Sequence, residues 1–351
     1  MKKILKNITL LVVCMSLLSA ISLVSCKTTE PVVTEQATTE PVVTEQATTE
    51  DLTFANVTVS LGDEWLGYSM EAFKLAADIK GVKVQVYDSE WDSERHLRNV
   101  EDAINRGVDH IAVCIFTPEE AQSFIDLANS ANIPISFENS LLDPSKLKGD
   151  FVINVAFDYY ECGYAAMKYV SENWPNSKVF HLRGLPGMGI VEEYQRGVDD
   201  AVAEFGNIEV VANRDTDWST ESAMNVMTDF LGANIDFDVV FIHSDEMAAG
   251  AVTPLNDAGL LDDVKIIVSN GGPTGVSMLK SGEIEAAISI PVSLQALLLF
   301  KGMWLYHKGI EPPKKVMVPP LKVIDINNIN ELVSWEPTKE HIDLIGGLDK
   351  W

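Results

Sequence analysis

Short apolar, β-branched runs alternate with amphipathic stretches along residues 55–325. Apolar positions recur at helical spacing in the amphipathic stretches, for example at Leu97, Val100 and Ile104 within 93–106 and again within 118–131. Strands that alternate with helices predict an α/β protein whose parallel sheets are covered by crossover helices. The predicted strands are 57–61, 82–87, 110–115, 134–138, 151–155, 178–182, 209–213, 239–242, 264–268 and 286–290.

The first 25 residues have a different pattern. Lys2, Lys3 and Lys6 precede an almost wholly apolar run, and Ser25 lies directly before Cys26. A basic start, an apolar run and a small residue before a cysteine are typical of a lipoprotein signal. We therefore predict a signal peptide at 1–25 and lipid attachment at Cys26. A transmembrane helix is the alternative, because the run approaches the length that spans a bilayer, but no basic stop-transfer cluster follows it.

Residues 28–47 are two copies of TTEPVVTEQA. Their Thr, Glu, Pro and Gln content offers too little apolar surface to fold. We predict that residues 26–53 form a lipid-anchored linker, whose flexible part has a root-mean-square span on the order of 25–30 Å. An O-glycosylated spacer, or one without a selected role, fits the same composition.

Composition narrows the function classes. The chain has 351 residues, and residues 51–351 are enough for two domains that each bury a core. The formal net charge of -26 argues against binding to nucleic acid, whose phosphates require Lys and Arg. Beyond Cys14 and Cys26, only Cys114 and Cys162 remain, and we favour two free thiols over a disulfide. No CxxC or HExxH motif supports a zinc site, and we predict no metal and no cofactor.

Polar and aromatic residues gather where the predicted strands end. Ligands of open α/β sheets bind beyond the carboxyl ends of the strands. Carboxylates and amides can bridge adjacent hydroxyl groups, and indole rings can cover the apolar face of a sugar, so these positions favour a polyhydroxylated ligand. Capping of the following helices is the alternative, above all for Asp245. The candidate ligand-binding residues are Asp63, Glu64, Trp65, Glu138, Asn139, Asp158, Arg183, Asp217, Trp218, Ser244, Asp245 and Asn270.

Five segments together resemble the type I periplasmic sugar-binding proteins, the ribose, galactose and xylose group that supplies ABC transporters. The segments are INRGVDHIAV at 104–113, ANSANIPISFEN at 128–139, SDEMAAGAV at 244–252, NGGPTG at 270–275 and SGEIEAAISI at 281–290. The resemblance implies two Rossmann-like lobes with parallel sheets, joined by a three-segment hinge near Phe157, Pro291 and Pro319. The implied lobes are 54–156 plus 292–318 and 157–291 plus 319–351.

The resemblance also implies roles for single residues. Trp65 and Trp218 correspond to two aromatic residues that face each other across the ligand. Glu138 and Asn139 stand where the family usually has an Asp-Arg pair, and we expect Glu138 to contact the ligand. Further departures from the family are Ser244, Asn270 and Ile290 in place of the frequent Asn, Asp and Gln, and Glu192 near a usual sugar-binding Arg.

These departures predict an acid-rich pocket. Only Arg183 plausibly opposes the carboxylates, so an anionic ligand would meet like charge. A neutral sugar or polyol is the favoured ligand, and an amino sugar or another small cation is the alternative. The acidic candidates are Glu138, Asp158, Glu192, Asp217 and Asp245.

The resemblance implies a substrate-binding lipoprotein of an ABC-type importer, anchored to the cell envelope membrane by lipid only, on its periplasmic or surface side. Its lobes would close around the ligand, and a permease would recognise the closed form. A sensor that presents its ligand to a chemoreceptor or kinase would have the same fold. We predict no enzyme: adjacent helical residues such as Glu192 and Glu193 point in different directions, unlike a glycosidase pair, and His243 is interpreted as a packed strand-end residue.

Overall fold

The computed structural model describes residues 52–351. The predicted signal peptide, Cys26 and nearly all of the predicted linker lie outside the described residues. Within residues 52–351, no helix combines the length and the apolar character needed to cross a membrane.

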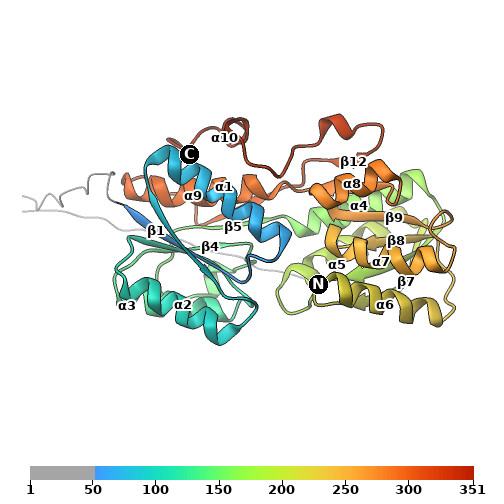
Figure 1. Ribbon diagram of the computed structural model, residues 1–351, viewed down its shortest axis with the longest axis horizontal. Helices are drawn as coiled ribbons and strands as arrows, with labels where there is room; N and C mark the ends of the chain where they lie inside the picture. The colour runs from blue at the N-terminus through green and yellow to red at the C-terminus, as the bar shows by residue number, and fades with distance from the viewer. Residues whose placement is uncertain (1–51) are drawn as a thin grey trace, which may run out of the picture. The chain divides into compact units, whose positions relative to one another are not determined.

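The described residues form two six-stranded sheets, and the first has the order β11-β5-β4-β3-β1-β2 with all neighbours parallel. Helices α1 and α9 cover one of its faces, and α2 and α3 cover the other (Figure 1). This first lobe consists of β1 (Thr53–Thr58), α1 (Glu64–Lys80), β2 (Lys83–Asp88), α2 (Ser93–Asn105), β3 (His110–Cys114), α3 (Glu120–Ser130), β4 (Ile135–Glu138), β5 (Asn154–Phe157), α9 (Val292–His307) and β11 (Lys315–Val318).

The second sheet has the order β12-β10-β9-β8-β6-β7, and only β12 runs antiparallel to its neighbour. Successive strand residues face opposite sides, so Val239 and Phe241 pack in the core under α4 and α5, whereas Val240 and Ile242 pack under α6 and α7. This second lobe consists of α4 (Tyr159–Asn173), β6 (Ser177–Arg183), α5 (Ile190–Phe205), β7 (Ile208–Asp215), α6 (Thr220–Gly232), β8 (Val239–Ile242), α7 (Asp245–Asp257), β9 (Lys265–Asn270), α8 (Pro273–Ser281), β10 (Ala286–Ser289) and β12 (Val323–Asp325).

The chain passes from one sheet to the other between β5 and α4, between β10 and α9, and between β11 and β12. These segments lie side by side: Asp158 N donates to Val318 O at 2.8 Å, and Ser289 N donates to Lys322 O at 2.8 Å. The predicted crossover positions at Phe157, Pro291 and Pro319 coincide with them. The predicted fold class, two α/β lobes joined by a three-segment hinge, is confirmed.

The C-terminal segment departs from the predicted lobe boundary. After β12, the chain returns to the first lobe, where α10 (Lys339–Leu344) packs on α9. Lys301 Nζ on α9 donates to Ile345 O at 2.7 Å, and Asp349 forms an ion pair with Lys80 on α1. Assigning all of 319–351 to the second lobe is therefore wrong, because the apolar side chains of the last residues pack against the first-lobe core.

Strand boundaries differ from prediction by three residues or more at two strands. β1 begins at Thr53, four residues before the predicted start, and β5 spans Asn154–Phe157 in place of the predicted 151–155. β11 and β12 were not predicted. Both strands are short, β11 begins with a polar residue and a polar residue precedes β12, so no alternating apolar pattern marks them. Within the described part of the chain, Cys114 and Cys162 are buried free thiols, as predicted.

Candidate functional site

A cavity of about 80 Å³ lies at the carboxyl ends of the strands of both lobes. A buried water needs roughly 10–15 Å³ measured in this way, so the cavity has room for about six waters or one small ring. Eight predicted residues line it: Asp63, Glu64, Trp65, Asn139, Trp218, Ser244, Asp245 and Asn270. Lining residues that were not predicted to bind ligand include Trp91, Tyr159, Tyr194, His243, Glu246 and Trp335.

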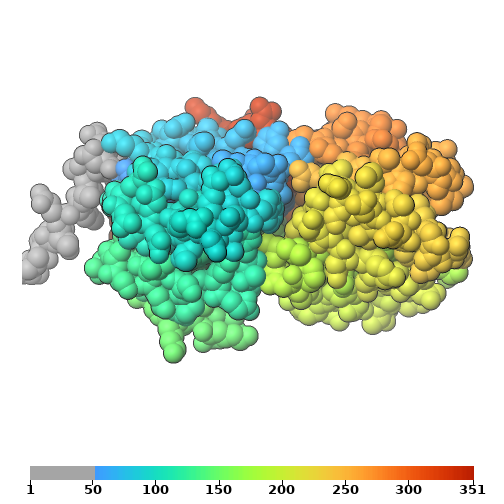
Figure 2. All heavy atoms as spheres, turned by 60° about the horizontal axis from the view of Figure 1, so that its bottom comes forward, coloured from blue at the N-terminus to red at the C-terminus, as the bar shows by residue number. Residues whose placement is uncertain are grey.

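The lobes contact each other beside this cavity. Glu64 N at the start of α1 donates to Glu246 Oε1 on α7 at 3.2 Å, and Thr274 Oγ1 on α8 donates to Glu64 Oε1 at 3.3 Å. Figure 2 shows the lobes meeting on one face, where the blue and green spheres of the first lobe lie against the yellow and orange spheres of the second. The two lobes are therefore in contact at the rim of the cavity.

Trp65 forms the first-lobe wall. Its indole is 9% exposed and meets Phe157 edge-on at a centroid distance of 5.5 Å. Trp335, from the segment between β12 and α10, meets Trp65 edge-on at 5.1 Å and is almost fully buried. No local pattern marks Trp335 as a site residue, because only the return of the C-terminal segment brings it to the cleft.

Trp218 lies on the second-lobe side of the cavity. Its backbone φ is +74°, a left-handed conformation that is strained for a bulky residue and that often marks a functional site. A Cβ on Gly184 would overlap the Trp218 ring, so glycine at 184 makes room for the indole. His243 stacks on Tyr194 at a centroid distance of 4.0 Å, next to Trp218.

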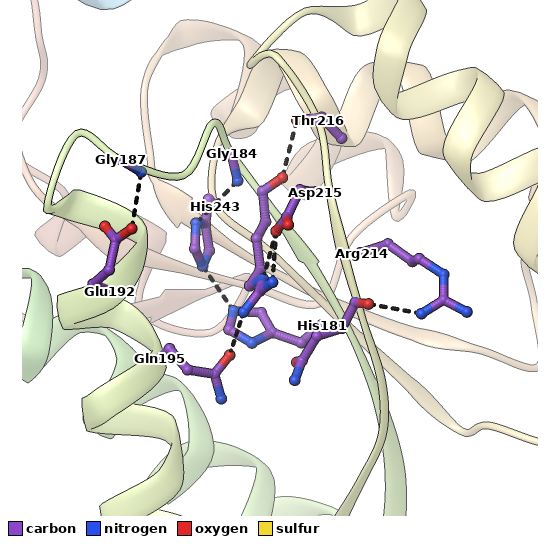
Figure 3. A network of polar contacts seen from close by, with 11 residues as sticks. His181, Gly184, Gly187, Glu192, Gln195, Arg214, Asp215, Thr216 and His243 are labelled. Carbon is purple, nitrogen blue, oxygen red and sulfur yellow. Dashed lines mark hydrogen bonds and ion pairs between the residues drawn. The ribbon is translucent and has the colours of Figure 1, made fainter. Parts of the chain in front are cut away.

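A polar network holds the loops behind this wall (Figure 3). Gly184 N donates to His243 Nδ1 at 3.2 Å, and the two histidine Nε2 atoms of His181 and His243 are 2.7 Å apart. Because Nδ1 of His243 accepts a hydrogen bond, its proton belongs on Nε2 and points at His181. Burial lowers the pKa of His243 well below its usual value and that of His181 to about 3, so both rings are neutral. His243 is packed, as predicted, and also lines the cavity.

Arg183 and Glu192 belong to this network and do not line the cavity. Arg183 forms an ion pair with Asp215 at 2.7 Å and donates to Gln195 Oε1 at 3.0 Å. Glu192 points back from the first turn of α5 and accepts from Gly187 N at 2.8 Å (Figure 3). In the structure, both side chains hold neighbouring loop and helix residues.

Three more predicted residues lie away from the cavity. Glu138 is buried between α1 and α9, where Ser69 Oγ and Gln295 Nε2 donate to its carboxyl, and burial raises its pKa. Asp158 caps α4 by accepting from Glu161 N at 3.1 Å. Asp217 accepts from Ser219 N at 3.0 Å and lines an outer pocket at the rim. Glu138, which we expected to contact the ligand, therefore does not line this cavity, because its side chain lies between α1 and α9.

Four carboxyl groups meet at the cavity from the N-termini of α1 and α7: Asp63, Glu64, Asp245 and Glu246. Asp245 is buried and accepts from Gly272 N at 2.6 Å. Burial raises the pKa of Asp245 to about 8 and that of Glu246 to about 7, with Glu64 and Asp63 as neighbouring negative charges. Among residues 52–351, no Lys or Arg lines the cavity, and no group of His, Cys, Asp and Glu could hold a metal ion.

These raised pKa values predict how stability depends on pH. Folded Asp245 and Glu246 hold protons that the unfolded chain has released, so the free energy of unfolding falls as pH rises through about 7–8. Buried histidines with lowered pKa values make the free energy of unfolding rise with pH, but only below about pH 6.5. We expect urea unfolding of the ligand-free protein to show stability decreasing from about pH 6.5 to about pH 8.5, and Asp245→Asn to flatten that slope. An equal slope in the unchanged protein and in Asp245→Asn would contradict the assignment of a raised pKa to Asp245.

The sequence profile described as "periplasmic binding protein domain" matches residues 54–309. This chain belongs to the periplasmic binding protein family. The family resemblance drawn from the five segments is confirmed, and the relatives agree with it. The ribose import binding protein of Salmonella typhimurium is 29% identical over 267 residues, which cover 76% of this chain and 84% of that protein. The D-xylose-binding periplasmic protein of Escherichia coli is 25% identical over 231 residues, 64% of this chain and 69% of that protein.

Solved structures of the same family share the fold. An ABC transporter periplasmic solute-binding protein from Actinobacillus succinogenes with bound D-allose is 27% identical, with a TM-score of 0.73, and the match covers 80% of this chain and 99% of that one. A Bacillus halodurans solute-binding protein with bound myo-inositol is 23% identical, with a TM-score of 0.74 and coverage of 81% and 98%. The two-lobed architecture described above is thus that of the family.

Proposed function

We propose that this periplasmic binding protein captures one small polyhydroxylated molecule, a monosaccharide or cyclic polyol, and delivers it to the permease of an ABC-type importer. The observation that carries the proposal is the cavity at the strand ends of both lobes, with Trp65 on one side and Trp218 on the other. Apolar ring faces of a sugar pack on indoles, while its hydroxyl groups exchange hydrogen bonds with amides and hydroxyls.

Asn139, Ser244 and Asn270 are the proposed partners of the ligand hydroxyl groups. Each lines the cavity at or just beyond the end of a strand, and each carries a group that can donate or accept. Asn139 and Asn270 have positive φ values of 51° and 103°, and positive φ is more readily adopted by Asn than by most other residues. The turn after each strand thus aims a short amide into the cavity.

The names of the relatives support transport. They include ribose, xylose and fructose binding proteins, and two of these names state import. Export to the periplasm is the corresponding proposal for location, and the signal-like residues 1–25 support it. Attachment through a lipid on Cys26 is a further part of this proposal. It would keep the binding lobes within reach of a membrane permease.

A thermal-shift screen tests the proposal. A ligand that binds only the folded state raises the melting temperature. We expect at least one neutral sugar, cyclic polyol or amino sugar to raise it, and Asn270→Ala to reduce the shift. The matched control is Asn256→Ala, which changes an exposed Asn on the far end of α7. A protein that responds to nucleosides or polyamines alone would contradict the proposal.

A further inference from the structure

We infer that the ligand of this cavity carries a protonated amino group on a small hydroxylated ring, as in an amino sugar or an aminated cyclic polyol. The inference rests on the proposed function and names the ligand class within it. Three features of the cavity carry it: its carboxyl groups, its aromatic rings and its unpartnered indole N–H groups.

Within residues 52–351, the carboxyl groups have no cationic partner at the cavity. Asp63 and Glu64 face Asp245 and Glu246 across the cleft, and backbone or hydroxyl groups supply their hydrogen bonds. Glu64 Oε2 is buried and has no donor at all. Opposite charge within a few ångströms favours ionised carboxylates in a poorly solvated site. A positive group on the ligand would supply the missing charge, and an anionic ligand would be repelled.

Aromatic rings make up much of the remaining wall. Trp65, Trp91, Trp218 and Trp335 line the cavity, together with Tyr159 and Tyr194. Ring faces carry negative potential and attract cations, most strongly when the site is desolvated. Carboxylates beside several aromatic faces form an environment suited to an ammonium group, whereas neutral hydroxyl groups gain little from so much negative potential.

Two buried indoles show that the ligand also has acceptors. Trp65 is 9% exposed and Trp335 is 2% exposed, both line the cavity, and neither Nε1 has a hydrogen-bond partner. Buried donors normally find an acceptor. An ammonium group has none, so a simple polyamine or quaternary ammonium ion leaves both indoles unsatisfied. Ring hydroxyl oxygens supply the acceptors, which is why the inference combines hydroxyl groups with an amine.

A neutral sugar is the competing ligand, and pH separates the two. With pKa values raised by burial, Asp245 and Glu246 can stay protonated and donate to sugar hydroxyl groups. The groups facing this pair are Asp63 and Glu64 from α1, the Gly271, Gly272 and Gly275 amides, and Tyr194 from α5. A cationic ligand binds better as the pair ionises while its own amino group stays protonated, so its affinity rises between about pH 6 and pH 7, and a neutral sugar bound by protonated acids loses affinity over the same range.

Calorimetric titration of matched pairs tests the inference. The pairs are D-glucosamine with D-glucose, D-galactosamine with D-galactose, and an aminodeoxyinositol with myo-inositol. We expect the amine of at least one pair to bind about tenfold more tightly than its neutral partner or better, a ratio that corresponds to about 1.4 kcal/mol. The ratio should grow from about pH 6 to about pH 7, where the amines still hold most of their protons.

Variants assign the effect to the carboxyl groups. Glu246→Gln should reduce the amine-to-neutral ratio several-fold, and Glu64→Gln provides a second test if the first variant folds poorly. Asp257→Asn is the control, because Asp257 is the exposed last residue of the same helix, far from its N-terminus. An unchanged ratio in both Glu variants would overturn the inference.

The outcomes also separate the inference from the proposed function. Neutral members that bind as tightly as the amines or more tightly overturn the inference and leave the proposed sugar-binding function intact. If choline or putrescine binds and no hydroxylated ring compound binds, both the inference and the proposed function are overturned, because neither molecule is a sugar or a cyclic polyol. Binding of no member of any pair overturns the inference as well.

Discussion

Replacing Trp218 with alanine is expected to weaken ligand binding by about 1–3 kcal/mol, through lost stacking and lost apolar burial. The indole is only partly buried in the ligand-free protein, and its strained backbone presents it to the cavity. The free energy of unfolding should therefore change less than the binding free energy. Titration calorimetry with the ligand found by the thermal-shift screen measures the loss.

Two further variants, at Trp65 and Trp351, complete this experiment. Trp65→Ala should weaken binding by a similar amount, but with a larger loss of stability because Trp65 packs on Phe157 and Trp335. Trp351→Ala is the control, since Trp351 is the exposed terminal residue and does not line the cavity. If affinity is unchanged in both Trp218→Ala and Trp65→Ala, the cavity is not the ligand site.

The second large effect is expected at Gly197, where α5 packs on α4. An added Cβ would overlap the backbone carbonyl oxygen of Tyr160, and a backbone atom cannot turn aside as a side chain can. We expect Gly197→Ala to lower the free energy of unfolding by about 1–3 kcal/mol, as other overpacked sites do. Urea unfolding measures the change. Binding should weaken too, because Tyr159 and Tyr194 on these helices line the cavity.

Gly232 provides a matched control for this substitution. It ends α6, and a Cβ there would meet no atom within 4 Å. Alanine is favoured over glycine in helices by up to about 1 kcal/mol, so Gly232→Ala should be neutral or stabilising. Equal effects of the two substitutions would mean that α4 and α5 are not packed as closely as described.

Helix capping explains why the sequence alone only partly distinguished cavity-lining residues from helix-capping residues at the strand ends. An Asp after a strand is suited both to cap the next helix and to bind a ligand. Asp158 caps a helix and does not line the cavity, whereas Asp63 and Ser244 do both. The same local pattern thus has different outcomes, since the direction of each side chain relative to the cleft depends on how the lobes pack.

Glu138 and Asn139 show the same limit at adjacent positions. Successive residues at a strand end point to opposite faces. Asn139 faces the cavity, while Glu138 points between α1 and α9 and accepts from Gln295. The residue types mark both as candidates, but which face borders the cleft is decided by the packing of helices from distant parts of the chain.

The sequence alone determined the alternation of strands and helices, the family and the strand ends at which the site lies, because these depend on local periodicity and on short contiguous segments. Only the tertiary structure decided that Trp335 returns to the cleft, that Glu246 meets Glu64 across it, and that Arg183 pairs with Asp215 instead of facing the ligand. Such contacts join residues far apart in the chain. They form because burial of apolar surface brings two lobes and a C-terminal segment together, and no local pattern encodes which side chains then become neighbours.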